Sequence, residues 1–335
     1  MEFESVQHAI HFAKGSQIEI VIVEGKVIDV TKFKHAHPGG EESINKYIFQ
    51  DVSIIYNNVK SHFTKTAIRE LMKFKIGHIK TDKDNKPIVK DVQEHDIAYD
   101  VDLKKGTFYQ VFTKLNLETY LAFIHDPKHM IDPPEAILFE TPALEFFTKT
   151  PWYAIPIIWI PVVLYLMYYA FRYNGVSLPQ IALCYGIGVF LWTLVEYFLH
   201  RCVFHIDEKL PDNRYAFVLH YALHGIHHAF PMDPNRLVFP PLAAVPIFYM
   251  FIKTYSYVFE EFGMAFLSGS ITGYIMYDMT HYFIHHVSPK FKYYNWLKKY
   301  HIFHHYKDPH RGYGVSQHIW DKVFDTVLIL DEGEK

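Results

Sequence analysis

The chain has 335 residues, enough for two or three domains, and 17% of them are aromatic. Its formal net charge of -3 gives no argument for nucleic acid as a partner, so none is expected. The two cysteines, Cys184 and Cys202, exclude a disulfide framework and a cysteine-rich metal site. The N-terminal sequence lacks the apolar run of a secretory signal peptide, which predicts that the front of the chain stays in the cytosol.

Residues 1–80 are expected to form a small soluble domain of mixed α and β structure. The alternating segment from Ile18 to Val30 predicts two strands that turn at Glu24-Gly25. Farther along, a helical run is expected to open at Ser61-His62 and to end at Phe74-Lys-Ile-Gly77.

The sequence His37-Pro-Gly-Gly lies between the predicted strands and this helical run. Its glycines let the backbone pass close to a flat ring, and its proline sets the turn that aims the histidine. Together with the Val-Ile-Asp-Val-Thr lead-in and the downstream His62, the segment resembles the cytochrome b5 family. The resemblance implies that His37 and His62 are the two axial ligands of a b-type haem. An iron with both axial positions filled by protein suits the transfer of one electron.

The next two segments connect this domain to the rest of the chain. Residues 81–106 are charged and lack periodicity, which predicts a linker. Residues 107–150 mix aromatic side chains with Lys, His and Pro, and are expected to form an amphipathic segment before the membrane. A packed soluble helix is an equally good interpretation of part of this segment.

From Pro151 onward the chain is expected to cross a membrane. Residues 152–171 run for twenty positions without a charge, and residues 178–195 for eighteen, which meets the length of a span. Two further runs of sixteen residues start at Leu237 and Phe262. The predicted spans are therefore about 152–171, 178–198, 237–258 and 262–283.

The distribution of positive charge predicts how these spans are oriented. The connections between paired spans carry almost no Lys or Arg, whereas the 201–236 loop and the tail after His286 carry several. By the positive-inside rule, the tips of both hairpins lie in the lumen and the histidine-rich loops at the cytosol.

Four histidine clusters lie beside the predicted spans. Fourteen of the 23 histidines fall between His200 and His318, many of them three to five residues apart. On a helix, spacings of three and four residues put side chains on one face. This predicts that His224, His227 and His228 lie together, as do His281 with His285, and His301 with His304 and His305. Neutral imidazole is a common metal ligand that suits iron, zinc and copper. The clusters are His200-Arg-Cys-Val-Phe-His205, His224-Gly-Ile-His227-His228, His281-Tyr-Phe-Ile-His285-His286 and His301-Ile-Phe-His304-His305.

This pattern, interleaved with hydrophobic spans, resembles the fatty acid hydroxylase superfamily of membrane di-iron oxygenases. Similar features include Thr148-Lys-Thr, Tyr277-Asp278 before His281, and the closing Gly312-Tyr-Gly-Val. The whole chain therefore predicts a small α+β cytochrome b5-like domain, followed by an all-α multi-span membrane domain (151–335) with a cytosolic histidine-rich metal cap. The resemblance implies two iron ions, which zinc can replace, held by His200, His205, His224, His227, His228, His281, His285, His301, His304 and His305.

Four other histidines compete for these roles on spacing alone. For His220, His286, His310 and His318 the structural or surface interpretation is favoured.

Three further residues are candidates for a role at the centre. Glu196 and Asp278 lie near the cytosolic ends of apolar spans, where an ionisable group is costly. Each is expected to orient a ligand histidine through its ring N–H. Tyr277 and Asp278, just before His281, are the candidate catalytic residues.

The resemblance implies hydroxylation at C2 of long or very long acyl chains for sphingolipids, with O2 as co-substrate. Electrons would come through the haem domain from an NAD(P)H-dependent cytochrome b5 reductase or a similar reductase. The other expected partners are an acyl lipid or ceramide substrate and the lipid bilayer, in the endoplasmic reticulum membrane. The alternatives are a sterol oxidase or acyl desaturase of the same superfamily and, in another class, a membrane-anchored electron carrier with structural zinc.

Overall fold

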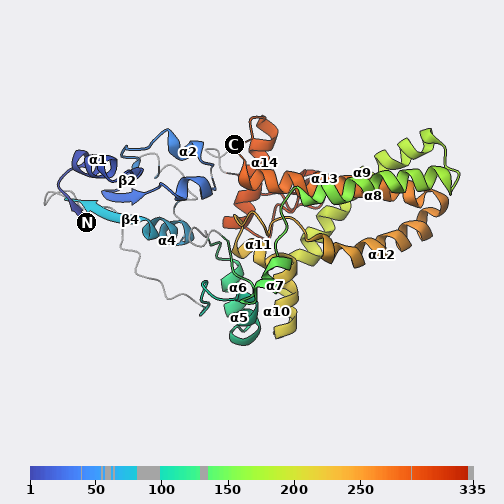
Figure 1. The fold of residues 1–335 in the computed structure, drawn as a ribbon, viewed down its shortest axis with the longest axis horizontal. Coiled ribbons are helices and arrows are strands. Elements are labelled where there is room, and N and C mark those ends of the chain that lie inside the picture. The colour runs from blue at the N-terminus through green and yellow to red at the C-terminus, as the bar shows by residue number, and fades with distance from the viewer. Residues whose placement is uncertain are drawn as a thin grey trace.

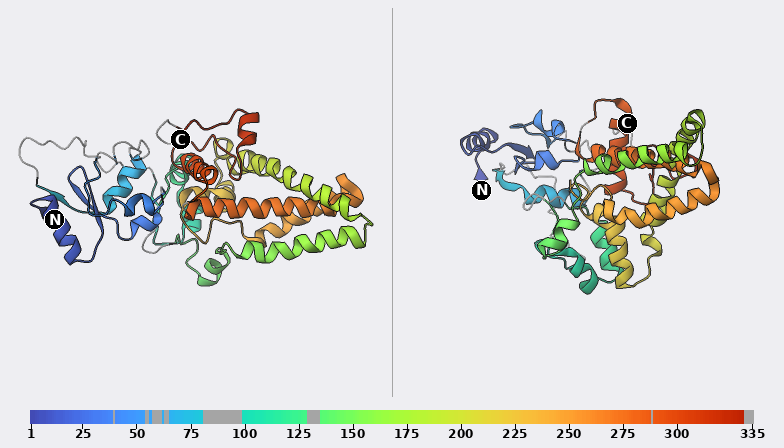
Figure 2. Two further views of the ribbon diagram at one scale, coloured as in Figure 1. Left: turned by 90° about the horizontal axis from the view of Figure 1, so that it is seen from above. Right: turned by 45° about the vertical axis from the view of Figure 1, so that its right-hand side comes forward.

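A computed structural model describes residues 1–38, 40–53, 56, 62, 65–80, 99–128, 135–287 and 289–330 of the chain. Figure 1 shows an N-terminal domain at one end, a cap of short helices in the middle and long helices that project from the cap at the other end. Figure 2 shows the same long helices running side by side, away from the N-terminal domain. The α+β domain followed by a helical membrane domain is therefore confirmed.

A four-stranded sheet organises the N-terminal domain, in the order β1-β4-β3-β2. Strands β2 (Ile20–Val23) and β3 (Lys26–Asp29) form the expected antiparallel hairpin. Its turn residues Glu24 and Gly25 both have positive φ, 51° and 75°, as a two-residue turn between twisted strands requires. One face of these strands packs on helix α1 (Val6–Gly15). The other packs against the short helix α2 (Glu42–Asn45), which follows the short helix η1 (Phe33–Ala36) in the chain.

The end of this domain differs from the expected helical run. Helix α4 (Lys65–Lys73) stops at Lys73, and strand β4 (Lys75–Ile79) follows at once. Strand β4 pairs with β3 and with the N-terminal strand β1 (Glu2–Phe3). A local sequence pattern reveals neither pairing. The stretch Phe74–Gly77 therefore belongs mainly to the sheet, because pairing with distant strands overrides the local helical pattern.

Residues 81–98 of the predicted linker 81–106 lie outside the described residues. The remaining residues, 99–106, contain no helix or strand. Beyond the linker, helices α5 (Thr107–Lys114) and α6 (Leu117–Ile124) pack into a common core with α10 (Arg214–His220). This part of the predicted amphipathic segment is thus a packed part of the cap. Helix α7 (Pro142–Phe147), in the same predicted segment, buries none of its residues and exposes Phe146 and Phe147.

Among the described residues, three stretches are long and apolar enough to cross a membrane. They are helix α8 (Ala154–Arg172), helix α9 (Leu178–Leu199) continued to Phe204, and the segment Pro241–His286. The last is a hairpin of α12 (Pro241–Phe259) and α13 (Gly263–His286), joined by the turn η6 (Glu260–Phe262). Both weaker runs of the sequence therefore extend into full helices, because their partly polar ends continue the same helical backbone.

Small residues bring α9 and α13 into close contact. A Cβ atom on Gly188 of α9 would collide with the carbonyl oxygen of Phe266 and lie 3.1 Å from the Cα of Gly269. The Ser270 hydroxyl donates a hydrogen bond to the Gly188 carbonyl at 3.0 Å. Small residues that allow close helix contact, reinforced by a hydroxyl, are the usual way in which helices associate in a bilayer.

We expect Gly188→Leu to separate α9 from α13 and to cost ~3 kcal/mol of stability, the upper end of the usual range for overpacking, because the obstructing atom is a backbone carbonyl that cannot rotate away. Gly186 is the matched control on the same helix, since a Cβ atom there has nothing within 4 Å. Thermal unfolding in detergent should show a lower Tm for Gly188→Leu and little change for Gly186→Leu. Equal effects of the two substitutions would contradict this account of the helix contact.

The remaining elements form the cap at the C-terminal ends of α9 and α13. They carry most of the histidines of the four clusters, which brings segments distant in sequence to one place (Figure 1). These elements are η3 (His200–Phe204), η4 (Asp207–Lys209), η5 (Tyr221–Gly225), α11 (Ile226–Ala229), α14 (Lys292–Tyr306) and α15 (Ile319–Val323).

Candidate metal centre

The structure brings the ten predicted ligand histidines together as two buried groups of five. Within each group, one potential ligand nitrogen from every histidine lies within 4.8 Å of all the others. The first group is His200, His205, His224, His228 and His304, and the second is His227, His281, His285, His301 and His305.

Helix geometry explains how the clusters divide between the two groups. Residues four apart on a helix stay together, as His224 and His228 do in the first group, and His301 and His305 in the second. Neighbouring residues point roughly 100° apart, so His227 and His228 serve different groups. The expectation that each cluster presents its histidines together is therefore wrong for the second and fourth clusters.

The first cluster meets its group through an unusual turn. The five-residue spacing of His200 and His205 does not match an α-helix, but η3 is a π-helical turn, in which the His205 N–H donates to the His200 carbonyl at 3.0 Å. Such turns bring residues i and i+5 together and occur often at functional sites. As a result the two Nε2 atoms lie 3.2 Å apart.

Within each group, the distances between ring nitrogens fit the ligands of one shared metal ion. The Nε2 atom of His205 is 3.0 Å from that of His304, and the Nε2 of His301 is 2.9 Å from that of His281 and 3.0 Å from that of His305. Two imidazole nitrogens at right angles around a metal, each ~2.1 Å from it, would stand ~3 Å apart.

Several ring nitrogens of the centre are buried without a hydrogen-bond partner among the described residues. They include both nitrogens of His227 and of His285, and Nε2 of His228. A buried polar atom without a partner is costly, and a metal ion would relieve that cost. Burial and the neighbouring imidazoles hold the pKa values of His224, His227, His228, His301, His304 and His305 well below their usual range, so the rings are neutral, as metal ligands must be.

Backbone carbonyls of the C-terminal loop orient two of the rings. The Nδ1 atom of His200 donates to the Tyr313 carbonyl at 2.6 Å, and that of His304 to the Arg311 carbonyl at 2.7 Å. A proton held on Nδ1 leaves the lone pair on Nε2, which faces the group.

Glu196 is hydrogen-bonded to this loop. Among the described residues it makes no hydrogen bond to a histidine ring. Its carboxylate accepts the N–H groups of Val315 and Ser316 at 3.1 and 2.8 Å. Glu196 therefore orients the ligand histidines indirectly, through the loop whose carbonyls bind their rings. Sequence reasoning missed the carbonyl partners, although the Gly312-Tyr-Gly-Val resemblance pointed to this loop.

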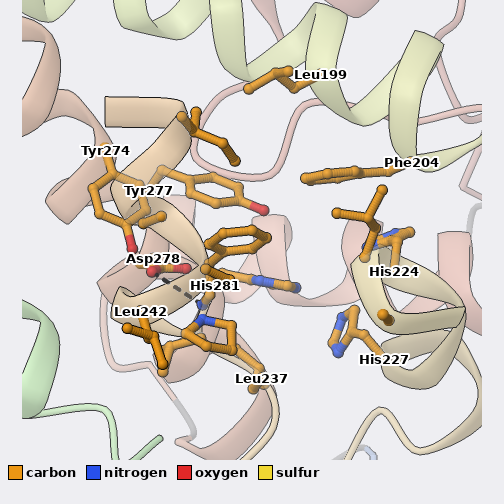
Figure 3. Close-up of a pocket in the computed structure, with 18 of the residues that line it drawn as sticks. Leu199, Phe204, His224, His227, Leu237, Leu242, Tyr274, Tyr277, Asp278 and His281 are labelled. Carbon is orange, nitrogen blue, oxygen red and sulfur yellow. Dashed lines mark hydrogen bonds between the residues drawn. The ribbon is translucent and has the colours of Figure 1, made fainter. Parts of the chain in front are cut away.

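Asp278 and Tyr277 lie beside the second group. Asp278 is 1% exposed, accepts the Phe239 N–H at 3.3 Å and faces the Tyr274 hydroxyl (Figure 3). Its hydrogen bond thus goes to the start of the α12 hairpin, not to a ligand ring. The Tyr277 ring stacks on His281, with ring centroids 5.7 Å apart.

A cavity of about 530 Å³ adjoins both groups and was not anticipated from the sequence. His224 of the first group faces it together with His227 and His281 of the second, and Tyr277 lies across from His224 (Figure 3). The rest of the lining is largely apolar, from α9, α12 and α13.

At one side of the cavity lies Arg236, a buried cation in an ionic cluster. Its guanidinium pairs with Asp233 at 2.8 Å and with Glu145, and donates to the Thr148 hydroxyl at 3.2 Å. Thr148 and Arg236 both line the cavity. The Thr148-Lys-Thr feature thus supplies a hydroxyl to the cavity lining, beside a buried cation.

The four competing histidines lie outside both groups. His220 uses both ring nitrogens, with the Tyr120 hydroxyl at 2.6 Å and the Phe204 carbonyl at 2.7 Å. His286 packs on Tyr282, His318 on Trp296, and His310 is exposed.

In the N-terminal domain, His37 and His62 face each other with ring centroids 6.1 Å apart. The Nδ1 atom of His62 donates to the Tyr56 carbonyl at 3.2 Å, and that of His37 lies 3.0 Å from the Ser43 hydroxyl. For His62 this leaves the lone pair on Nε2. The facing rings and their Nδ1 partners fit the two axial ligands of one haem iron.

The chain matches two protein families. Residues 7–80 match the cytochrome b5-like haem or steroid binding domain, and residues 185–326 match the fatty acid hydroxylase family. It is 36% identical to a ceramide very long chain fatty acid hydroxylase of Schizosaccharomyces pombe, over 92% of this chain and 93% of that protein. A dihydroceramide fatty acyl 2-hydroxylase of Arabidopsis thaliana is 43% identical, over 68% of this chain and 94% of the relative. A solved structure of full-length Scs7p, with only its hydroxylase domain visible, matches with a TM-score of 0.65 and 38% identity, over 69% of this chain and 86% of that one.

Proposed function

The chain is an enzyme of the fatty acid hydroxylase family with a cytochrome b5-like domain in front, and we propose that it hydroxylates C2 of long acyl chains for sphingolipids. The names of its relatives support an acyl or ceramide substrate. We assign residues 1–80 to the haem domain and residues 151–335 to the membrane hydroxylase domain.

One observation carries the proposal most directly: an apolar cavity of about 530 Å³ reaches both histidine groups. Ligand cavities are typically apolar, with a few polar groups that set orientation. A hydrocarbon chain suits the apolar lining, and the polar end at Arg236 and Thr148 suits the carbonyl end of an acyl group. C2 lies next to that carbonyl, so a carbonyl held by these two residues would fix the position of C2 within the cavity that both histidine groups face.

We propose iron as the bound metal, with five histidines at each position. When bound, the two iron ions supply O2 activation and oxidation of the C–H bond. Five imidazoles at each position exceed the four ligands of a structural zinc, which speaks against the electron-carrier alternative. The protein's own contribution is to hold neutral imidazoles in place and to line the reaction space with apolar side chains that exclude water.

We propose that Tyr277 orients the bound chain and that Asp278 holds the wall of the cavity through Phe239. Tyr277→Phe is expected to lower the hydroxylation rate ~10- to 100-fold at unchanged metal content, because a hydroxyl facing the cavity is lost while the ring remains on His281. Metal analysis and turnover of the purified enzyme measure the two effects. Tyr274→Phe, one turn earlier on α13, is the control and should change the rate less. Loss of metal from Tyr277→Phe would assign the residue to metal binding instead.

We also propose that the enzyme lies in the endoplasmic reticulum membrane, with the haem domain and the metal cap on the cytosolic side. The lysines and arginines of the 201–236 loop and of the C-terminal region support this orientation. A glycosylation acceptor inserted in the 173–177 turn should be modified in microsomes, and one inserted after Lys290 should not. The reverse pattern would overturn the orientation.

The proposed reaction is tested by lipid mass spectrometry of cells that express the wild type or the His304→Ala, His305→Ala variant. We expect 2-hydroxy acyl sphingolipids with the wild type only. New double bonds in acyl chains would favour the desaturase alternative, and oxidised sterols the sterol oxidase alternative. Identical lipids in both cultures, with a metal-loaded wild type, would reject C2 hydroxylation.

A further inference from the structure

An ion pair joins helix α4 of the N-terminal domain to the cap. The Arg69 guanidinium pairs with the Asp126 carboxylate, 57 residues later and beyond the predicted linker. The Asp126 side chain is 13% exposed and that of Arg69 36%. The pair is thus partly shielded from water, where a charge-assisted contact is stronger than at an open surface.

The cap holds Asp126 in place independently of Arg69. The Tyr99 hydroxyl donates to the Asp126 carboxylate, and the Lys128 ammonium lies 3.9 Å from it. Lys128 is itself buried, 4.6 and 4.0 Å from the ring centroids of Tyr99 and Phe123. The cap therefore holds the Asp126 carboxylate in a position to accept a hydrogen bond from Arg69 of the N-terminal domain.

The segment that carries Asp126 also contacts the elements that hold the metal ligands. The Lys128 N–H donates to the carbonyl of Ala229 at 2.7 Å, the residue directly after His228. On the other side of the interface, Arg69 lies in α4, which begins three residues after His62. The ion pair therefore joins the helix next to one proposed haem ligand to a segment of the cap that is hydrogen-bonded to α11, the helix that carries two proposed metal ligands.

We propose that the Arg69–Asp126 pair docks the haem domain on the cap face formed by residues 123–128, so that the haem passes electrons to the metal centre within the chain. This inference rests on the proposed function. A haem held by His37 and His62 would give up one electron in each transfer, going from ferrous to ferric, and the metal ions held by the ten histidines would take that electron up. A monooxygenase turnover takes two electrons and two protons, reducing O2 to the inserted hydroxyl and water, so an NAD(P)H-dependent reductase must reduce the haem twice.

A charge swap tests the docking. Arg69→Asp places two carboxylates against each other, and Arg69→Asp with Asp126→Arg restores an opposite pair. In the holoenzyme we expect Arg69→Asp to speed amide hydrogen exchange in residues 120–128 and to slow oxidation of pre-reduced haem, with O2 and acyl substrate present, about tenfold. The double variant should recover both towards the wild type.

Lys75→Glu is the matched control, because Lys75 is exposed on strand β4 and its substitution makes the same kind of charge change in the same domain. It should leave exchange and haem oxidation unchanged. Chemical reduction of the metal centre should give Arg69→Asp one normal turnover, which separates failed electron delivery from failed chemistry. If the wild type makes no product even then, the proposed function fails, and the exchange data still test the docking. Wild-type exchange and haem oxidation in Arg69→Asp, or a double variant no better than the single one, would overturn the proposal.

Discussion

His305→Ala is expected to empty one of the two metal positions and to lower hydroxylation by well over 100-fold. His305 is 3% exposed, and its Nε2 lies 3.0 Å from that of His301. Its ring is also 4.3 Å from that of His228, which belongs to the other group. Losing a residue that merely supports a ligand typically costs 10- to 100-fold in metal affinity or activity, so losing the ligand itself should cost more.

Metal analysis of the purified protein measures this effect directly, with two iron ions per chain in the wild type and one or fewer in the variant. His286→Ala is the matched control, since His286 belongs to the same kind of His-His pair but packs on Tyr282, outside both groups. It should retain both metals. Full metal content in His305→Ala, or equal loss in both variants, would contradict the assignment of ligands.

His62→Ala is expected to abolish the haem spectrum of a six-coordinate iron and to reduce reductase-driven hydroxylation to background. The reason is that His37 and His62 face each other at 6.1 Å, so removal of either opens one axial position. The metal centre in the cap should keep its two ions, because the N-terminal domain contributes none of the ten histidines.

His35→Ala is the control, because His35 is an exposed histidine two residues from His37 that pairs with Glu41. Its haem spectrum and activity should match the wild type. A His62→Ala protein that keeps a normal haem spectrum would reject His62 as an axial ligand. Full reductase-driven activity without haem would instead reject electron delivery through this domain.

Short spacings, which are a local property, placed the candidate histidines in clusters, and the family resemblance separated the ten that the structure gathers from the four that compete on spacing alone. Neither the spacings nor the resemblance could divide these ten into two groups. His227 and His228 are neighbours in sequence yet belong to different groups, and His200 and His205 meet only through a π-helical turn. Such a turn depends on packing in the cap and leaves no clear mark in the local sequence.

Interactions over long distances in the chain account for most of what was missed. Strand β4 pairs with β1, which lies at the other end of the domain's sequence. The local helical pattern near Phe74 was therefore misleading. Glu196 was expected to orient a ring, but it binds the backbone of a loop about 120 residues later, and that loop orients the rings. The cavity forms between α9, α12 and α13, whose packing no single segment specifies.

The reaction itself is tested most directly with purified enzyme, 18O2 and an acyl substrate that carries two deuterium atoms at C2. We predict a product with one 18O atom at C2 and one deuterium lost from that carbon. A product that gains a double bond without 18O, or a hydroxyl at another carbon with both deuterium atoms retained, would contradict hydroxylation at C2.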